Sequence, residues 1–444
     1  MSSWKQVRFS EICDITRGGS PRPIQEYMTN DGVPWIKISD ATASNSRFIE
    51  KTKEFIKTSG ISKSREVFPD DLILSNSATP GIPKFMRIYA CIHDGWLLLR
   101  NFNGAEKEFI YWLLLNERDK LIQQGNGSVF TNLKTDILKN HIVNIPDDIE
   151  EQKRIATILN NIQEKIELNT QINQTLEQIA QTIFKSWFID FDPVHAKAEA
   201  LANGQTAEQA TQAAMAVISG KNTQELHRLQ TANPEQYQQL WEIAEAFPSG
   251  FSGYKNLGEI PIGWNVLTFK DFISESKEKI GSLEDVPEYS VGNEGIYPRS
   301  EKYNKSLSKT PEKNKVVRIG DLVFGMGSKT LNWGIMNDEI GSVSPAYFVY
   351  RIFTNINYIY LNKYIKAKEY DFQNLIKPTS RQGQSVDKEM FLKKEIYVPN
   401  EYLLNIYLNK LKEIDSLVYS YTTEVLILEQ IRDELLPKLL SGEI

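Results

Sequence analysis

Residues 149–188 read IEEQKRIATILNNIQEKIELNTQINQTLEQIAQTIFKSWF, a stretch without proline or glycine. Apolar residues recur at spacings of three and four: Ile155, Leu159, Ile162, Ile166, Leu176 and Ile183. This spacing is typical of a long amphipathic helix with a coiled-coil seam. At about 1.5 Å per residue the helix would be about 60 Å long, more than one ordinary domain needs.

Asn169 and Asn173 occupy two further positions of this seam. Asparagine is a poor core residue, but one at a seam position fixes the register of a helix pair. We interpret both as register-setting residues. The alternative is that they are exposed breaks in the seam.

A second helix is predicted over residues 402–440, near the end of the chain. Its seam positions are Tyr407, Leu411, Ile414, Val418, Tyr421, Val425, Leu428 and Leu435. The tetrapeptide LEQI at 176–179 recurs at 428–431, an offset of 252 residues. At this offset Leu159, Ile162 and Ile166 fall on Leu411, Ile414 and Val418. The predicted helix–helix contacts are therefore Leu159, Ile162, Ile166, Asn169, Asn173, Leu176, Leu411, Ile414, Val418 and Leu428.

The composition predicts a globular protein of two or three domains. The chain has 444 residues, of which 41% are hydrophobic, enough to build cores. It has no run of 18 apolar residues and no signal peptide at its start, so we expect a cytoplasmic protein without a membrane partner. Two cysteines, Cys13 and Cys91, and four histidines form no disulfide framework and no metal set.

The net charge of −6 is unevenly distributed. Residues 1–146 and 251–399 each carry a net charge of +3. The predicted helices 147–186 and 400–444 carry −3 and −4, and residues 187–250 carry −5. Both globular regions are therefore mildly basic, which permits contact with DNA without requiring it.

The two globular regions share a sequence of parts. In the first, residues 33–38 and 72–74 are predicted strands, residues 106–124 a helix, and the loops are rich in Ser, Asn, Gly and Arg. Segments 264–269, 320–324 and 396–399 of the second region correspond to segments 4–9, 70–74 and 143–146 of the first. The near-constant offset indicates an internal duplication. Residues 189–257 are predicted to form an acidic, helix-prone insert and linker. Extended loop is predicted at 247–248 and at 250–263.

The order of these parts resembles the specificity subunit of type I restriction-modification systems, over essentially the whole chain. Further details carry the resemblance: WFIDFDP at 187–193, HAKAE at 195–199, LGEIPIGW at 257–264 and LLSGEI at 439–444. No one of these motifs is specific alone, and the resemblance rests on their order.

The resemblance implies an α+β fold. Two α/β target recognition domains, 1–146 and 258–399, would be joined by two long antiparallel coiled-coil helices, 147–188 and 400–444, as a pseudo-twofold internal repeat. Each domain would read one half of a split, asymmetric site in double-stranded DNA, and the helices would act as a spacer. Two methyltransferase subunits would dock on the chain, and nuclease-translocase subunits would join that complex. S-adenosylmethionine, ATP and magnesium would belong to those partners, with no cofactor, metal or catalytic residue in this chain.

Loop residues suited to DNA are the candidate binding residues. Arg and Lys suit guanine, Asn and Gln suit adenine, and all of them, with Ser, can contact phosphate. The candidates in the first region are Arg17, Ser20, Arg22, Lys37, Ser75, Asn76, Lys84 and Arg87. Those in the second are Asn293, Arg299, Ser328, Lys329, Asn332, Arg381, Gln382 and Gln384. Trp35 and Trp264 are interpreted as core residues rather than base-stacking platforms.

Catalytic motifs are absent from the sequence. It has no Asn/Asp-Pro-Pro-Tyr/Phe motif of an adenine methyltransferase, and Ser328 interrupts the only segment similar to a phosphate-binding loop, 325–330. Two alternatives to a restriction subunit remain open. One is a coiled-coil scaffold that binds only protein, and the other is the recognition subunit of a methylation-only defence complex.

Overall fold

The computed structural model describes residues 3–43, 46–124, 132–254, 256–292, 295–303, 307–325, 332–378 and 384–444, with the backbone alone at 373, 377–378 and 384–385. The chain forms two compact units. Unit 1 is Met1–Leu176 with Asp415–Ile444, and unit 2 is Glu177–Ile414. Among the described residues, none of the helices has both the length and the apolar character of a membrane span.

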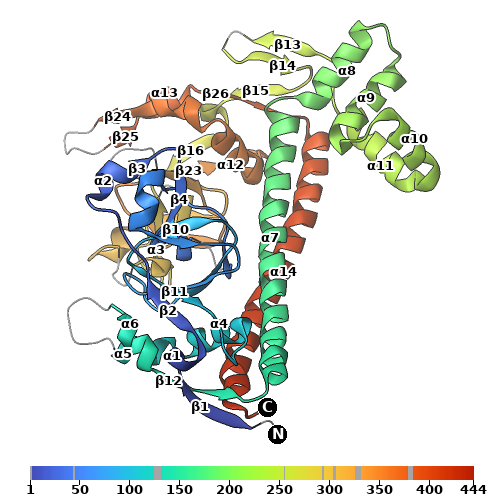
Figure 1. Ribbon diagram of the computed structural model, residues 1–444. Coiled ribbons are helices and arrows are strands. Elements are labelled where there is room, and N and C mark those ends of the chain that lie inside the picture. The colour runs from blue at the N-terminus through green and yellow to red at the C-terminus, as the bar shows by residue number, and fades with distance from the viewer. Residues whose placement is uncertain are drawn as a thin grey trace. The chain divides into compact units, whose positions relative to one another are not determined.

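Two long helices contribute to both units (Figure 1). They are α7 (Ile149–Phe188) and α14 (Glu401–Ser441). In unit 1, Asn169 Nδ2 donates a hydrogen bond to Glu424 Oε2 at 2.9 Å, and Asn173 Nδ2 donates to Thr422 Oγ1 at 3.0 Å. As residue numbers rise along α7, those of the partner residues in α14 fall, so the helices are antiparallel. The ten predicted seam residues are all buried or half-buried.

The globular part of unit 1 contains three sheets. The antiparallel pair is β1 (Trp4–Arg8) with β12 (Ile142–Pro146). One five-stranded sheet has the order β2 (Asp14–Arg17), β11 (Trp96–Arg100), β8 (Leu72–Ser75), β9 (Pro83–Met86) and β5 (Phe48–Ile49). The other has the order β3 (Met28–Thr29), β6 (Phe55–Ile56), β4 (Val33–Ile36), β10 (Ala90–Ile92) and β7 (Arg65–Val67). The helices are α1 (Phe9–Ile12), α2 (Ile24–Tyr27), α3 (Ile38–Ala41), α4 (Lys107–Asn116), α5 (Arg118–Gln124), α6 (Thr135–Asn140) and the 3₁₀ helix η1 (Thr58–Lys63).

Strand β8 is buried on both faces. Leu72 and Leu74 belong to the core that also contains α4, while Ile73 belongs to the core on the opposite face. Alternate side chains of a strand point to opposite faces. A strand with apolar neighbours on both faces therefore reads as a continuous apolar run, as Leu72-Ile73-Leu74 does.

Unit 2 contains smaller sheets. Its four-stranded sheet has the order β16 (Ile273–Ser276), β23 (Phe348–Ile352), β20 (Leu322–Phe324) and β21 (Trp333–Ile335). The two-stranded sheets pair β13 (Phe251–Tyr254) with β14 (Gly258–Pro261), β15 (Asn265–Thr268) with β26 (Glu395–Val398), β17 (Tyr289–Gly292) with β18 (Gly295–Pro298), β19 (Lys315–Arg318) with β22 (Ile340–Val343), and β24 (Ile376–Pro378) with β25 (Gln384–Val386). Its helices beside the sheets are α12 (Tyr358–Ala367), α13 (Lys388–Leu392) and the 3₁₀ helices η2 (Phe269–Asp271), η3 (Arg299–Glu301), η4 (Pro311–Lys313) and η5 (Glu369–Leu375).

The two units share part of their topology, which confirms the predicted internal duplication. The pair β1·β12 corresponds to β15·β26, and the order β2-β11-β8-β9 corresponds to β16-β23-β20-β21. An arginine–aspartate pair recurs at the same place. Arg100 of β11 binds Asp71 before β8, and Arg351 of β23 binds Asp321 before β20. The correspondence proposed between segments 70–74 and 320–324 is therefore structural.

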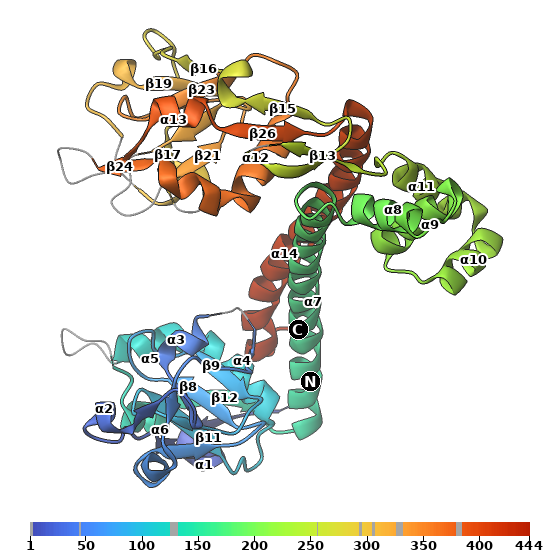
Figure 2. The ribbon, with the colours of Figure 1, turned by 90° about the horizontal axis from the view of Figure 1, so that it is seen from above.

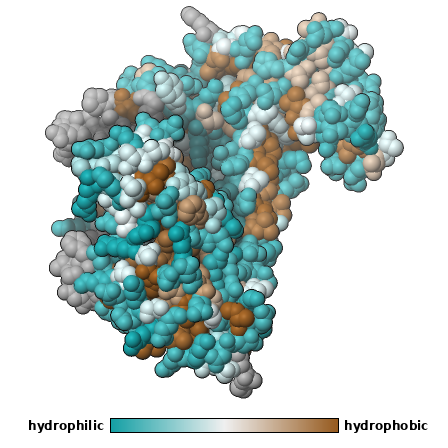
Figure 3. Space-filling model, viewed as in Figure 1, coloured by the Kyte–Doolittle hydropathy of each residue, from teal (hydrophilic) through white to brown (hydrophobic). Residues whose placement is uncertain are grey.

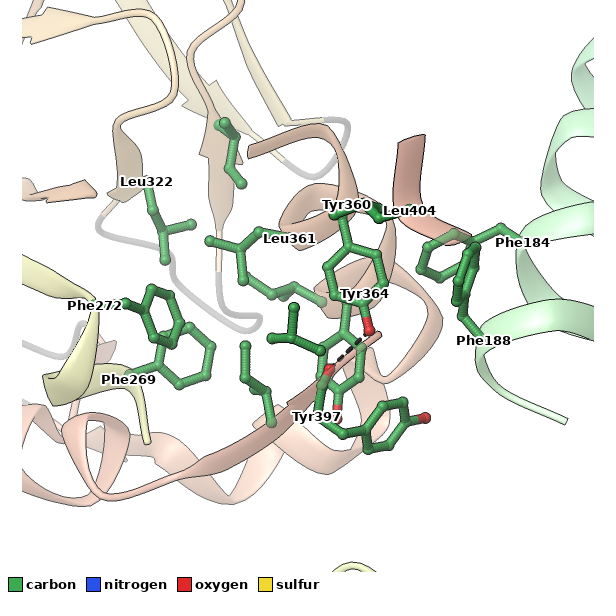
Figure 4. Packing of buried hydrophobic residues seen from close by; sticks show 14 of the residues in the cluster. Phe184, Phe188, Phe269, Phe272, Leu322, Tyr360, Leu361, Tyr364, Tyr397 and Leu404 are labelled. Carbon is green, nitrogen blue, oxygen red and sulfur yellow. Dashed lines mark hydrogen bonds between the residues drawn. The ribbon is translucent and has the colours of Figure 1, made fainter. Parts of the chain in front are cut away.

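The C-terminal end of α7 is part of the core of unit 2 (Figure 4). Phe184 and Phe188 point toward Tyr360 of α12, with ring centroids 5.7 and 5.6 Å from that of Tyr360. The Tyr360 hydroxyl donates a hydrogen bond to the Tyr397 carbonyl oxygen at 2.7 Å. Trp264 lies in this core, and Trp35 is buried in unit 1, each 4% exposed. Both are therefore core residues, as predicted.

The insert forms four helices that pack on one another (Figure 2). They are α8 (Asp192–Ala202), α9 (Ala207–Ser219), α10 (Thr223–Ala232) and α11 (Pro234–Glu245). Buried Lys197 of α8 donates hydrogen bonds to the carbonyl oxygens of Phe247, at 2.7 Å, and Ala244, at 3.2 Å. Burial lowers the pKa of Lys197. The extended loop expected at 250–263 is wrong for 251–254 and 258–261, because these residues form the paired strands β13 and β14.

Glu278 of unit 2 is bound by two arginines. It accepts hydrogen bonds from Arg318 Nη2 at 2.7 Å and Arg351 Nη1 at 2.9 Å, and these bonds hold the pKa of Glu278 below its ordinary value. The side chains of Glu278 and both arginines are partly exposed. We therefore expect Glu278→Gln to lower the free energy of unfolding at neutral pH by only about 1 kcal/mol.

The loss of stability caused by Glu278→Gln should become smaller as the pH falls. Because the folded-state pKa of Glu278 lies below the unfolded value, its stabilisation is present above the unfolded pKa and disappears as the pH falls through the folded pKa. Urea unfolding at steps from pH 7 to pH 3 measures this. Exposed Glu284→Gln is the matched control. Equal stability of variant and wild type at pH 7, or a loss that persists in acid, would contradict the prediction.

Candidate nucleic-acid interface

Four predicted DNA-binding residues of unit 1 meet at one turn. Asp94, between β10 and β11, accepts a hydrogen bond from Ser20 Oγ on its Oδ1 at 2.6 Å. Its Oδ2 lies 3.5 Å from Arg22 Nη2 and 3.9 Å from Arg17 Nη2. The Asp94 carbonyl oxygen accepts from Arg17 Nε at 2.8 Å and from Asn76 Nδ2 at 3.2 Å. We call Arg17, Ser20, Arg22, Asn76 and Asp94 the Asp94 cluster.

Members of the Asp94 cluster differ in exposure. The side chains of Arg17 and Arg22 are 60% and 81% exposed, whereas Asn76 is 4% exposed. The two guanidinium groups therefore face solvent, and Asn76 positions the turn beneath them. The hydrogen bond from Ser20, with the nearby charges of His93 and Arg17, holds the pKa of Asp94 below its ordinary value.

Glycines allow this loop to approach the turn closely. Gly18 N donates to the Trp96 carbonyl oxygen at 2.9 Å, and Gly19 N donates to that of Ile92 at 3.1 Å. A Cβ atom at Gly18 would lie 2.0 Å from the His93 carbonyl oxygen, which no side chain allows. The Gly18-Gly19 pair is thus what brings Arg17 and Arg22 onto the turn.

The other four candidates of unit 1 lie elsewhere. Lys37 Nζ is 2.6 Å from Glu54 Oε1, and the exposed Arg87 stacks on Phe48 with its guanidinium carbon 3.7 Å from the ring centroid. Ser75 is fully buried and donates to the Thr79 carbonyl oxygen. Lys84 is 5% exposed, bonds to the Ser46 carbonyl oxygen, and burial lowers its pKa to about 8. The structure does not support DNA contact by Ser75 or Lys84, because both are buried with internal partners.

In unit 2, Arg299 and Asn332 both bond to strand β17 of the hairpin β17–β18. Arg299 Nη1 donates to Ser290 Oγ at 3.1 Å, and Asn332 Nδ2 donates to the Val291 carbonyl oxygen at 3.5 Å. Two tyrosine rings contact the basic groups of this hairpin. The Arg299 guanidinium lies 4.5 Å from the Tyr303 ring centroid, and Lys302 Nζ lies 4.3 Å from that of Tyr297. We call Tyr297, Arg299, Lys302, Tyr303 and Asn332 the hairpin cluster.

Six candidates of the second region are not placed. Asn293, Ser328, Lys329, Arg381 and Gln382 lie outside the described residues, and of Gln384, in β25, only the backbone is described. Their assignment to DNA stays a prediction.

Four residues of these clusters, Asp94, Tyr297, Lys302 and Tyr303, are not among the predicted DNA-binding residues. Asp94 lies in a His-Asp-Gly turn between two apolar strands, and its carboxylate lacks the hydrogen-bond donor that marks most of the predicted DNA-binding residues. Tyr297 and Tyr303 flank Arg299 and Lys302 in the sequence, and aromatic residues beside basic ones are typical of stacking on nucleic acid. Among the described residues, no three His, Cys, Asp or Glu side chains come together as metal ligands.

Two known specificity subunits are similar to this chain, one of them over its full length. It is 30% identical to the type I restriction enzyme HindI specificity subunit of Haemophilus influenzae over 479 aligned positions, which cover 100% of both chains. It is 30% identical over 195 positions to the type I restriction enzyme MjaIX specificity subunit of Methanocaldococcus jannaschii, covering 43% of this chain and 45% of that one.

A domain family and a solved structure are also similar. Residues 1–178 match the family described as type I restriction modification DNA specificity domain. The crystal structure of a type I restriction-modification S subunit from M. genitalium aligns with a TM-score of 0.48 at 13% identity, covering 99% of this chain and 96% of that chain. On the full-length identity to the Haemophilus influenzae protein, the chain belongs to the specificity subunits of type I restriction enzymes, which are non-catalytic subunits.

Proposed function

We propose that this specificity subunit reads a split, asymmetric site in double-stranded DNA, one half with each unit. One observation carries the proposal. The order β2-β11-β8-β9 of unit 1 recurs as β16-β23-β20-β21 in unit 2, yet each unit presents a different basic cluster. A shared scaffold with unlike contact residues is what two readers of unlike half-sites require. The Asp94 cluster would read one half and the hairpin cluster the other.

The two clusters offer different chemistry. Arg17 and Arg22 present two exposed guanidinium groups beside a hollow of about 520 Å³, lined by Ser20, Pro21, Arg22, Pro23, Ile24 and Trp35. Guanidinium groups suit guanine edges and phosphates, and the apolar wall suits a sugar or a thymine methyl group. The hairpin cluster combines arginine, lysine and asparagine with two tyrosine rings, which support phosphate contact and stacking.

The partners would dock on the helices. Leu417, Tyr419, Leu426, Ile427 and Ile431 of α14 are 48%, 76%, 62%, 52% and 41% exposed. Figure 3 shows apolar side chains gathered over the two long helices. Such a stripe indicates a protein contact. We propose that two methyltransferase subunits bind the helices and that nuclease-translocase subunits join through the complex. S-adenosylmethionine, ATP and magnesium would then be held by those partners.

The helices would also set the gap between the half-sites. Inserting seven residues after Leu176 in α7 and seven before Asp415 in α14 keeps the seam, and both points lie where the chain divides into units. The insertion lengthens each helix by about 10 Å, so the gap in the recognised sequence should grow by about three base pairs. Mapping of methylated adenines measures the gap. An unchanged gap with methylation intact would remove the spacer role.

Arg299→Ala tests whether the hairpin cluster reads bases. Loss of a bidentate guanine contact should cost about 1–3 kcal/mol of discrimination, so base preference should relax in one half-site only. Sequences selected from a random duplex pool by the wild type and by the variant give the comparison. Arg228→Ala on the exposed face of α10 is the control. Relaxation of both halves, or of neither, would count against one unit reading one half.

The docking surface can be tested by co-purification. Replacing Leu426 and Ile427 with serine should weaken retention of the methyltransferase subunit at least tenfold, because two large exposed apolar side chains of α14 are lost. Replacing Leu201 and Val217 of the insert, which are 39% and 42% exposed, is the matched control. Full retention by the α14 variant, or equal loss in both variants, would place the docking surface elsewhere.

A further inference from the structure

Asp94 is a negative charge at the centre of a surface proposed to bind a polyanion. Its side chain is 39% exposed, and its carboxylate lies within 4 Å of two arginines. A carboxylate at this place repels phosphate and lowers the positive potential of the surface. It therefore weakens the general attraction for DNA that the two arginines would otherwise give.

Asp94 is held in place more tightly than the two arginines that contact its carboxylate. Asp94 is fixed by its own hydrogen bond from Ser20 Oγ at 2.6 Å, and its carbonyl oxygen is held by Arg17 Nε and by buried Asn76. The carboxylate's contacts with Arg17 Nη2 and Arg22 Nη2 are longer, at 3.9 and 3.5 Å, and both arginines are largely exposed. Exposed ion pairs of this kind are weak and easily exchanged for another acceptor.

The geometry thus gives the arginines a resting partner that a better acceptor displaces. A guanidinium group that leaves Asp94 for a DNA phosphate loses one ion pair and gains another. The net gain in binding free energy is therefore small, whatever the DNA sequence. A guanine edge accepts two hydrogen bonds from one guanidinium, which a neighbouring carboxylate at 3.5–3.9 Å does not match.

We propose that Asp94 is a specificity-determining positioning residue, which holds Arg17 and Arg22 in the free protein and suppresses their contact with non-target DNA. This inference rests on the proposed reading of DNA by unit 1. Asp94 acts through the arginines and need not touch DNA itself. Its removal should therefore strengthen binding to random DNA and reduce selectivity, the opposite of what loss of a binding residue does.

The test uses the full chain and a random-sequence duplex of DNA. Asp94→Asn keeps the size of the side chain and an oxygen that accepts from Ser20, but it removes the charge. We expect Asp94→Asn to bind the duplex about three- to tenfold more tightly at low salt, and the slope of log K against log salt to steepen by about one to two units as the arginines reach phosphate. Fluorescence anisotropy over a salt series measures both quantities.

Three further variants separate this role from simpler ones. Asp94→Glu keeps the charge and should bind as the wild type does. Asp119→Asn, on the exposed face of α5, changes the net charge equally and should raise affinity less than twofold. Adding Arg17→Gln and Arg22→Gln to Asp94→Asn should abolish the gain, because the effect passes through these side chains. Sequences selected from a random pool by Asp94→Asn should show relaxed base preference in one half-site only.

The outcomes separate this inference from the function it rests on. If the wild type binds the duplex and Asp94→Asn binds it no more tightly, the role of Asp94 is overturned and DNA reading is left in place. The same holds if Asp119→Asn gains as much affinity as Asp94→Asn. Absence of DNA binding by all folded variants and the wild type, with helical circular dichroism unchanged, overturns DNA reading and this inference together.

Discussion

The antiparallel packing of α7 against α14 is the interaction on which both units depend. Each helix supplies one segment to unit 1 and another to unit 2, so neither unit is complete without both helices. In unit 1 the amides of Asn169 and Asn173 bond across the pair, to Glu424 and Thr422. Polar contacts in an apolar seam cost stability and fix register, because a shifted pairing leaves them without partners.

The globular part of unit 1 is tied to this helix pair by a buried arginine. Arg47 is 2% exposed, and its guanidinium bonds to Glu108 of α4 at 3.0 Å and Glu164 of α7 at 3.1 Å. Its backbone nitrogen bonds to Glu167 of α7 at 3.0 Å. In unit 2 the corresponding connection is aromatic, through Phe184 and Phe188. The same helix is thus anchored by a charge network in one unit and by apolar packing in the other.

The duplication divides structure from recognition. The β1·β12 pair, the order β2-β11-β8-β9 and the Arg–Asp pair of unit 1 recur in unit 2, whereas the Asp94 cluster and the hairpin cluster are built from different kinds of residue. A scaffold that is repeated while its loops differ allows each unit to acquire its own base preference. This division would be the physical basis for the proposed reading of a site whose halves are unlike.

The sequence predicts the scaffold better than the site. Periodicity over forty residues specifies α7, whose bounds match the predicted stretch, because every third or fourth side chain faces the seam. Site residues lack such a repeat. Lys84 has the chemistry for phosphate, but it lies in strand β9, where all four residues are buried. Asp94 shows the converse, since its role depends on a fold that brings residues 17–22 to a turn more than seventy positions away. Residue type indicates what a side chain can bind, and only the fold decides whether it reaches solvent.

The central claim is that this chain dictates where DNA is modified by reading two half-sites at a fixed separation. Single-molecule sequencing of the source genome, with the gene intact and deleted, tests it directly. The account predicts that a split motif of methylated adenines, with one constant internal gap, is present in the intact strain and absent after deletion. A methylation map that is unchanged by deletion, in cells that express the methyltransferase subunit, would contradict it.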